Sequence, residues 1–191
     1  GKFNVYNLLA VVTAALSLGL QDEFIIDGIE SLKKVPGRSE RYVLPNGARV
    51  FIDYAHTPEA LKRMLQALLE FKPKKIILVF GCGGDRDFEK RSLMGKIAED
   101  YADLVVLTND NPRSEKPEQI VSQIKKGIFD QSKVEVHLDR REAVYSALEM
   151  TGTKDMVLIA GKGHETYQEF ADQRIHFDDR EVVESFIQQK N

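Results

Sequence analysis

The stretch Ile76–Phe80, which reads IILVF, is uninterrupted by any polar residue and is followed at once by Gly81. Continuous apolar strands of this kind are typical of parallel sheets whose two faces are both covered by helices. Similar apolar stretches occur at 104–107 and 156–160, with others at 49–54 and, more weakly, at 134–138. The pattern predicts an α/β fold with a doubly wound, mostly parallel, Rossmann-like sheet.

Helical patterns alternate with these strands, as right-handed βαβ units require. Thr57 and Pro58 are an N-cap followed by proline at the first helical position. Asp139 and Asp179 are predicted to cap later helices, and residues 167–170 and 174–177 are predicted to form a terminal β-hairpin. The helix stripes are expected to bury Leu61, Leu65, Leu68, Leu69, Leu93, Met94, Ile97 and Ala98.

Two helices are predicted before the sheet. Residues 3–18 are rich in Leu, Ala and Val and indicate a buried helix that ends at Gly19, and residues 22–34 indicate a second. The stretch Val35-Pro36-Gly37-Arg38 interrupts this pattern, so we expect one domain at 1–36 and another at 37–191. Because residue 1 is Gly and the helical pattern begins at once, we expect a segment of a longer protein, although a trimmed tag would look the same.

Composition excludes several classes of protein. The 27 basic and 30 acidic residues give a net charge of -3, which argues against a nucleic-acid partner. The single cysteine, Cys82, excludes an internal disulfide and favours a reducing compartment. The apolar stretch 8–18 is too short to span a bilayer. The four histidines show no metal-ligand spacing, so no zinc site is predicted.

Two loops at predicted strand ends carry opposite charges. In Asp110-Asn111-Pro112-Arg113, Pro112 stiffens the backbone and presents Arg113, whose guanidinium suits a carboxylate. The loop Gly161-Lys162-Gly163-His164-Glu165 offers a carboxylate that could receive an ammonium. It is no P-loop, because Lys162 is followed by glycine instead of Ser or Thr. An amino acid, or the amino-acid end of a larger molecule, would suit this pair of loops, whereas a solvated Arg113 in an ordinary turn is the alternative.

Three further groups of residues could bind ligand. Gly81-Cys82-Gly83-Gly84 precedes Arg86 and indicates either a tight turn or a phosphate-binding loop, with Arg86 held for an anion. Asp53 and His56 end the first strand and could contact a ribose and a base or phosphate, although His56 could equally be a simple turn residue. Asn4 and Asn7 share one face of the first helix and need polar partners.

Together these motifs resemble the C-terminal part of the Mur ligases. The resemblance runs the whole length of the chain, through Phe3 to Asn7, Pro36 to Arg38, Asp53 to Pro58, Phe80 to Asp87, Asp110 to Arg113 and Ala160 to Glu165. It implies that residues 1–36 are the last helices of a central ATP-binding domain and 37–191 the amino-acid-binding domain. It also implies the cofactors ATP and Mg²⁺, a bacterial cytoplasmic location and a monomer without membrane contact.

The resemblance assigns residues to two sites. Positions similar to the family's nucleotide side are Asn4, Asn7, Arg38, Asp53 and His56. Positions similar to its amino-acid pocket are Arg86, Asp110, Asn111, Pro112, Arg113, Gly161 and Glu165. No catalytic residue and no metal ligand is assigned within these 191 residues, because the phosphate-binding Gly-Lys-Ser/Thr loop is absent from them.

The Asp-Asn-Pro-Arg motif is similar to the version found in ligases that add meso-diaminopimelate to UDP-N-acetylmuramoyl-L-alanyl-D-glutamate through an acyl-phosphate. Diaminopimelate is lysine with one more carboxylate, which Arg113 is expected to bind while Glu165 and the Gly161 carbonyl hold the distal ammonium. Losing one partner of such a buried pair costs about 2–5 kcal/mol. The alternatives are the lysine-adding ligase of the same family, a sister such as folylpolyglutamate synthase, and an amino-acid-binding module without catalysis.

Overall fold

The computed structural model describes residues 2–32 and 35–190, with side chains described from residue 5 onward within these ranges. The chain divides into two compact units, Gly1–Val35 and Pro36–Asn191. The second unit contains all the strands and the loops that follow them. None of the helices in the described ranges is long and apolar enough to cross a membrane.

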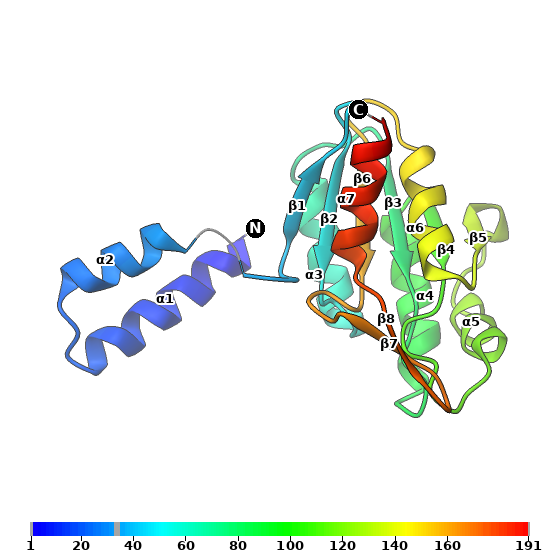
Figure 1. Ribbon diagram of the computed structural model, residues 1–191, viewed down its shortest axis with the longest axis horizontal. Helices are drawn as coiled ribbons and strands as arrows, with labels where there is room; N and C mark the ends of the chain where they lie inside the picture. The colour runs from blue at the N-terminus through cyan, green and yellow to red at the C-terminus, as the bar shows by residue number, and fades with distance from the viewer. Residues whose placement is uncertain (1, 33–34, 191) are drawn as a thin grey trace. The chain divides into compact units, whose positions relative to one another are not determined.

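A six-stranded sheet in the order β1-β2-β6-β3-β4-β5 forms the centre of the second unit (Figure 1). Every pairing from β2 to β5 is parallel, and only β1 runs antiparallel, against β2. This confirms the predicted doubly wound, mostly parallel fold. The strands are β1 Glu40–Val43, β2 Arg49–Asp53, β3 Ile76–Phe80, β4 Leu104–Leu107, β5 Val134–Val136 and β6 Met156–Ala160.

Helices cover both faces of this sheet, with α6 and α7 on one face and α3, α4 and α5 on the other (Figure 1). Their bounds are α3 Pro58–Leu69, α4 Glu89–Tyr101, α5 Pro117–Lys125, α6 Arg140–Glu149 and α7 Asp179–Lys190. The core side chains of β3 and β6 are buried on both faces, as the apolar stretches predict. The predicted hairpin is also present, as β7 Tyr167–Glu169 paired with β8 Arg174–His176.

Side-chain caps fix where two of these helices begin. The Thr57 hydroxyl accepts from the Ala60 N–H at 3.2 Å, and the Asp139 carboxylate accepts from the Glu142 N–H at 3.1 Å, as predicted. The prediction for Asp179 is wrong in detail. Asp178 caps α7 by accepting from the Arg180 N–H at 2.9 Å, whereas the Asp179 carboxylate is buried against Arg140.

The structure corrects other assignments from sequence. Leu69 and Leu93 are 45% and 53% exposed, whereas Met94 is buried as predicted and Met64, which was not predicted, also takes a core position. Strand β1 is absent from the sequence-based prediction, because this edge strand is four residues long and carries charged side chains. It joins β2 through a turn at Asn46-Gly47, in which Gly47 has a φ of 85°.

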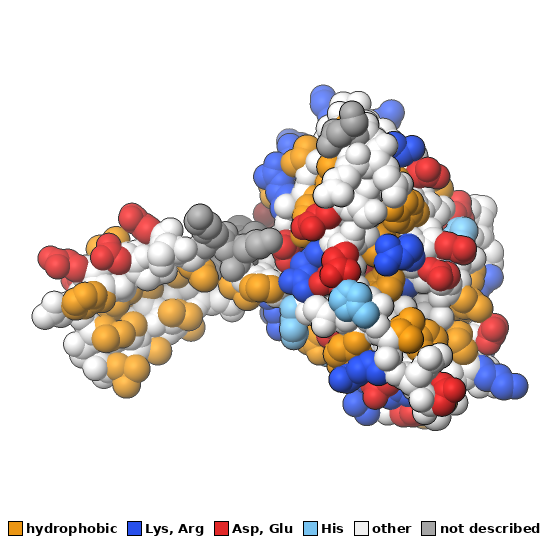
Figure 2. Space-filling model, in the orientation of Figure 1, with side chains coloured by type: hydrophobic (Ala, Val, Ile, Leu, Met, Phe, Trp, Pro, Cys, Tyr) orange, Lys and Arg blue, Asp and Glu red, His pale blue; other side chains and the backbone are white. Residues whose placement is uncertain are grey.

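The first unit contains α1 Lys2–Ser17 and α2 Asp22–Ser31. Gly19, with a φ of 76°, ends α1 as predicted, since its N–H donates to Leu16 and that of Leu20 donates to Ala15. The prediction of a buried helix is wrong for this chain. Val5 and Val11 are 59% and 63% exposed, and Figure 2 shows hydrophobic side chains along this unit. Two helices of this length are too small to enclose a core.

Candidate functional site

Four loops meet where β2, β3, β4 and β6 end, the edge at which open α/β sheets bind ligands. Backbone hydrogen bonds join them directly. The Gly161 N–H donates to the Asp53 carbonyl at 3.1 Å, and the Gly84 N–H donates to the Asn111 carbonyl at 2.9 Å. Because β4 and β6 both run parallel to β3, the two oppositely charged loops predicted from sequence lie at the same edge of the sheet.

The glycines after β3 allow close backbone packing. A Cβ on Gly84 would lie 1.9 Å from the Pro112 carbonyl oxygen, and one on Gly81 would lie 2.1 Å from that of Thr108. Such distances exclude any side chain at these positions without a shift of the neighbouring backbone. This agrees with a tight turn packed against the loop after β4, rather than with a loop left open for phosphate.

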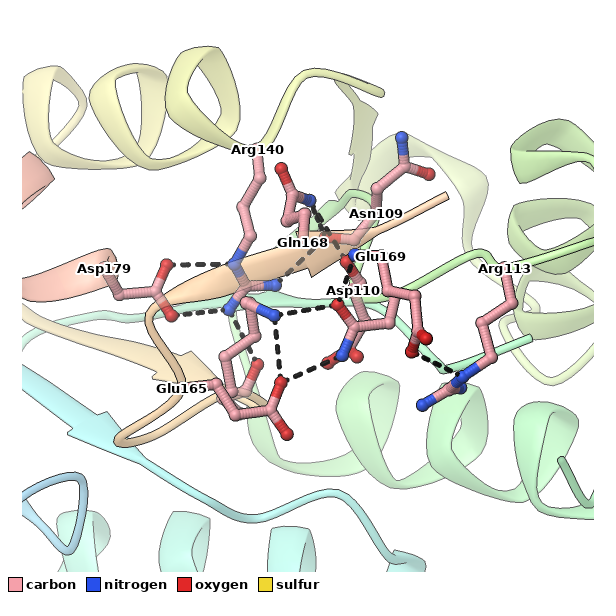
Figure 3. Close-up of polar contacts among 11 residues, drawn as sticks. Asn109, Asp110, Arg113, Arg140, Glu165, Gln168, Glu169 and Asp179 are labelled. Atoms are coloured by element: carbon pink, nitrogen blue, oxygen red, sulfur yellow. Dashed lines mark hydrogen bonds and ion pairs between the residues drawn. The ribbon is translucent and has the colours of Figure 1, made fainter. Parts of the chain in front are cut away.

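Asn111 lies at the centre of the site and is only 2% exposed. Its side-chain nitrogen donates to Glu165 Oε2 at 2.9 Å (Figure 3). Its Oδ1 accepts from Lys162 Nζ at 3.1 Å and from the Glu169 N–H at 3.0 Å. The buried Asn111 amide thus joins the loop after β4, the loop after β6 and the hairpin. From sequence, only a contact with ligand was predicted for Asn111, and not these contacts within the protein.

Lys162 belongs to the same cluster of contacts, although it was not predicted from sequence as a site residue. Its side chain is fully buried, and its Nζ donates to Glu165 Oε2 at 3.0 Å. Burial lowers the pKa of the Lys162 ammonium, and the Asp110 and Glu165 carboxylates oppose that shift. The Glu165 carboxylate, predicted to receive a ligand ammonium, already receives one from the protein itself.

Arg113 is held by the hairpin. Its φ is 51°, a left-handed conformation that is unusual for a residue other than glycine. Its N–H donates to the Glu169 carbonyl at 3.0 Å, and its Nε donates to Glu169 Oε2 at 3.0 Å. Its Nη1 donates to the Gly84 carbonyl at 2.7 Å. Glu169, and not Pro112 alone, therefore positions Arg113, which keeps 21% of its side chain exposed.

The other predicted pocket residues lie around this core of contacts. Asp110 is half-buried, and its Oδ2 would lie 2.6 Å from a Cβ on Gly161, which has a φ of 112°. Only glycine suits that position. Arg86 is exposed, and its Nη1 donates to the carbonyl of its neighbour Asp85 at 3.1 Å. The guanidinium of Arg86 thus remains accessible to solvent.

A buried ion pair lies beneath the site. Arg140 Nε and Nη2 each donate to the Asp179 carboxylate at 2.9 Å (Figure 3). The same guanidinium donates to the Asn109 carbonyl at 3.2 Å and to the Ala160 carbonyl at 3.1 Å. Arg140 therefore fastens the ends of β4 and β6, the strands that carry the two charged loops, to helix α7.

The predicted nucleotide-side residues are only partly brought together. Arg38 and His56 are exposed and flank the Tyr54 ring, at 5.2 Å and 4.5 Å from its centroid. Asp53 Oδ2 accepts from the Ser39 N–H at 2.7 Å, and burial raises the pKa of this carboxyl group. Asn7 is exposed and belongs to the first unit, and the Asn4 side chain lies outside the described residues.

Fold and site together define a doubly wound α/β domain with a cluster of charged side chains at the carboxyl edge of its sheet. Residues 37–163 match the family model described as Mur ligase, glutamate ligase domain. The chain belongs to the Mur ligase family.

Individual relatives agree with this family. The chain is 45% identical to UDP-N-acetylmuramoyl-L-alanyl-D-glutamate--2,6-diaminopimelate ligase 1 of Clostridium acetobutylicum, over 99% of the chain and 39% of the relative. It is 47% identical to the ligase of the same name from Clostridioides difficile, over 96% and 38%. A solved structure of a ligase with this name superimposes with a TM-score of 0.77 at 43% identity, covering 100% of the chain and 39% of its own. The chain thus spans about two fifths of the length of these relatives.

Proposed function

We propose that this chain is the C-terminal part of a Mur ligase of the MurE type. The complete enzyme would use ATP to join meso-diaminopimelate to UDP-N-acetylmuramoyl-L-alanyl-D-glutamate, in peptidoglycan synthesis. Residues 37–191 would bind the amino acid, and residues 1–36 would be the last helices of the ATP-binding domain. The relatives named above are ligases of this name, and we extend their activity to this chain.

The observation that carries the proposal is the junction of Arg113 and Glu165 through Asn111. Asn111 donates to the Glu165 carboxylate, and its Oδ1 accepts from the backbone N–H of Glu169, whose side chain pairs with Arg113. A cation and a carboxylate are thus fixed in one network at the ligand-binding edge. A ligand end that carries both an ammonium and a carboxylate complements this pair, as the distal end of diaminopimelate does.

The ion pair between Arg113 and Glu169 affects how strongly the site would distinguish diaminopimelate from lysine. Arg113 already pairs with Glu169, so a ligand without the distal carboxylate would not leave the guanidinium wholly unpaired. The discrimination expected from Arg113 therefore falls at the lower end of the 2–5 kcal/mol range, at about 2 kcal/mol. Exposed Arg86 is the second cation available to the ligand carboxylate. The lysine-adding ligase remains the alternative function.

The residues on the nucleotide side fit ATP in part. Arg38 and His56 have exposed side chains beside Tyr54 and suit phosphate or base contacts. Asp53 does not fit a direct ribose contact through Oδ2, which accepts from the N–H and the hydroxyl of Ser39. The described residues contain no group of three His, Cys, Asp or Glu side chains that could hold a metal. We therefore place the Mg²⁺ ligands in the remainder of the complete enzyme.

In this proposal the domain positions the diaminopimelate amine for attack on the acyl-phosphate of the dipeptide. Orientation of the two reactants would supply much of the rate enhancement. Arg38, beside the boundary between the two units, would neutralise phosphate charge. We place the enzyme in the bacterial cytoplasm as a monomer, without nucleic-acid or membrane partners.

A ligation assay tests this function. The full-length protein is expected to convert ATP, UDP-N-acetylmuramoyl-L-alanyl-D-glutamate and meso-diaminopimelate to the tripeptide product, ADP and phosphate. The isolated 191-residue chain is expected to form no product, and turnover by that chain alone would contradict the proposed division of labour. Diaminopimelate binding by the full-length protein without any ligation would favour the amino-acid-binding module instead.

A further inference from the structure

The candidate site has a carboxylate pole, Glu165, and a cationic pole, Arg113, and Lys162 contacts the first of them from a buried position. Its side chain is fully buried, whereas that of Glu165 is 18% exposed and that of Arg113 is 21% exposed. A buried ammonium is strongly unfavourable unless it is paired and hydrogen-bonded. Lys162 meets this condition through Asn111 Oδ1 at 3.1 Å, Glu165 Oε2 at 3.0 Å and the Tyr167 ring, whose centroid lies 5.3 Å from Nζ.

The contact with Lys162 occupies one oxygen of the Glu165 carboxylate. Its Oε2 accepts two hydrogen bonds, from Lys162 and from Asn111, whereas its Oε1 accepts none from the residues that the structure describes. The internal ammonium therefore determines which carboxylate oxygen stays available to a ligand. The Lys162 ammonium also balances the negative charge of Glu165. A ligand ammonium is then attracted less by the net charge of the site, so its binding depends more on a hydrogen bond to the free carboxylate oxygen.

Lys162 is also connected to Arg113, through Asn111 and Glu169. The Asn111 oxygen that accepts from Lys162 also accepts from the Glu169 N–H at 3.0 Å. The Glu169 carboxylate in turn pairs with Arg113 Nε at 3.0 Å. A continuous series of contacts, from Lys162 through Asn111 and Glu169 to Arg113, thus links the buried ammonium to the cationic pole of the site.

We infer that Lys162 is a positioning residue for amino-acid binding, which fixes the Glu165 carboxylate and, through Asn111 and Glu169, the Arg113 guanidinium. Lys162 would act only through these side chains, because its own side chain is fully buried. The inference rests on the proposed function, because it names the residue that sets the geometry of that same site. The charged groups that act on the Lys162 ammonium are Asp110, Glu165 and Arg140, which belong to three different parts of the chain.

The test compares Lys162→Met, Lys162→Arg and wild type in the full-length ligase. Met keeps an unbranched side chain of similar length and removes the charge and both hydrogen bonds. The KM for meso-diaminopimelate is therefore expected to rise about tenfold or more, the change that loss of ~1.4 kcal/mol gives. The KM values for ATP and for the UDP-dipeptide are expected to stay within about twofold, and kcat within about threefold, since these report interactions elsewhere. Lys162→Arg, which keeps the charge and the donors, is expected to recover part of the loss.

The outcomes separate this inference from the proposed function. A wild-type KM for diaminopimelate in Lys162→Met, or parallel increases in all three KM values, would overturn the positioning role. A wild-type enzyme that ligates no diaminopimelate would instead overturn the proposed function. If Lys162→Met fails to fold, Lys162→Gln is measured in its place, since it removes the charge and leaves only a shorter, neutral donor. A smaller but selective rise in the KM for diaminopimelate is then expected, and wild-type KM values would overturn the positioning role.

Discussion

Arg113→Ala in the full-length ligase is expected to lower kcat/KM for meso-diaminopimelate by about thirtyfold, which corresponds to ~2 kcal/mol. The substitution removes the guanidinium that would bind the distal carboxylate. Any use of L-lysine is expected to change far less, because lysine has no carboxylate at that end. The measurement is steady-state ligation with each amino acid at saturating ATP and UDP-dipeptide.

The same experiment has an internal control for structural damage. Arg113 also holds the Gly84 carbonyl and the Glu169 carboxylate, so its loss could loosen the site for every ligand. Such loosening would lower the kcat/KM for both amino acids together, and parallel losses would contradict the assigned role. Arg113→Lys is the matched variant, since it keeps the positive charge and loses the two-pronged geometry.

Arg140→Met is expected to have the largest effect on folding, a loss of about 3–5 kcal/mol in the free energy of unfolding. The substitution leaves the Asp179 carboxylate buried at 1% exposure with no cation beside it. It also removes the hydrogen bonds that the guanidinium donates to the Asn109 and Ala160 carbonyls. Urea denaturation of the 191-residue chain, followed by circular dichroism, measures the loss.

Arg63→Met is the matched control for this prediction. Arg63 pairs with Glu59 one helical turn away at 2.8 Å, but both side chains are more than half exposed. Exposed pairs of this kind contribute about 0–1 kcal/mol, so the control is expected to change the free energy of unfolding by no more than that. Similar small losses in both variants would show that the Arg140 pair does not fasten the site to α7.

The apolar stretches of the sequence were enough to predict the parallel strands of the sheet, but not the antiparallel edge strand β1. The strands Ile76–Phe80 and Met156–Ala160 agree with prediction to the residue, because each is buried on both faces and ends at a glycine. The caps at Thr57 and Asp139 were predicted as well, since a cap depends on residues only three positions apart. Local patterns therefore sufficed wherever local contacts decide the structure.

Contacts between distant residues could not be predicted in this way. Asp179 lies 39 positions from Arg140, and nothing local distinguishes its buried carboxylate from the capping carboxylate of Asp178. Lys162 was excluded as a phosphate ligand by its motif, but the sequence gives no sign that Asn111, 51 positions away, accepts from its ammonium. The one available signal was its position between two glycines, directly after a buried strand.

The most direct test of the account is calorimetric titration of the full-length ligase with meso-diaminopimelate and with L-lysine. Both titrations need the UDP-dipeptide and a non-hydrolysable ATP analogue present, so that the site is complete. A site in which Arg113 and Glu165 bind opposite charges of one ligand end predicts roughly thirtyfold tighter binding of diaminopimelate, equivalent to ~2 kcal/mol. Equal affinities for the two amino acids would contradict it.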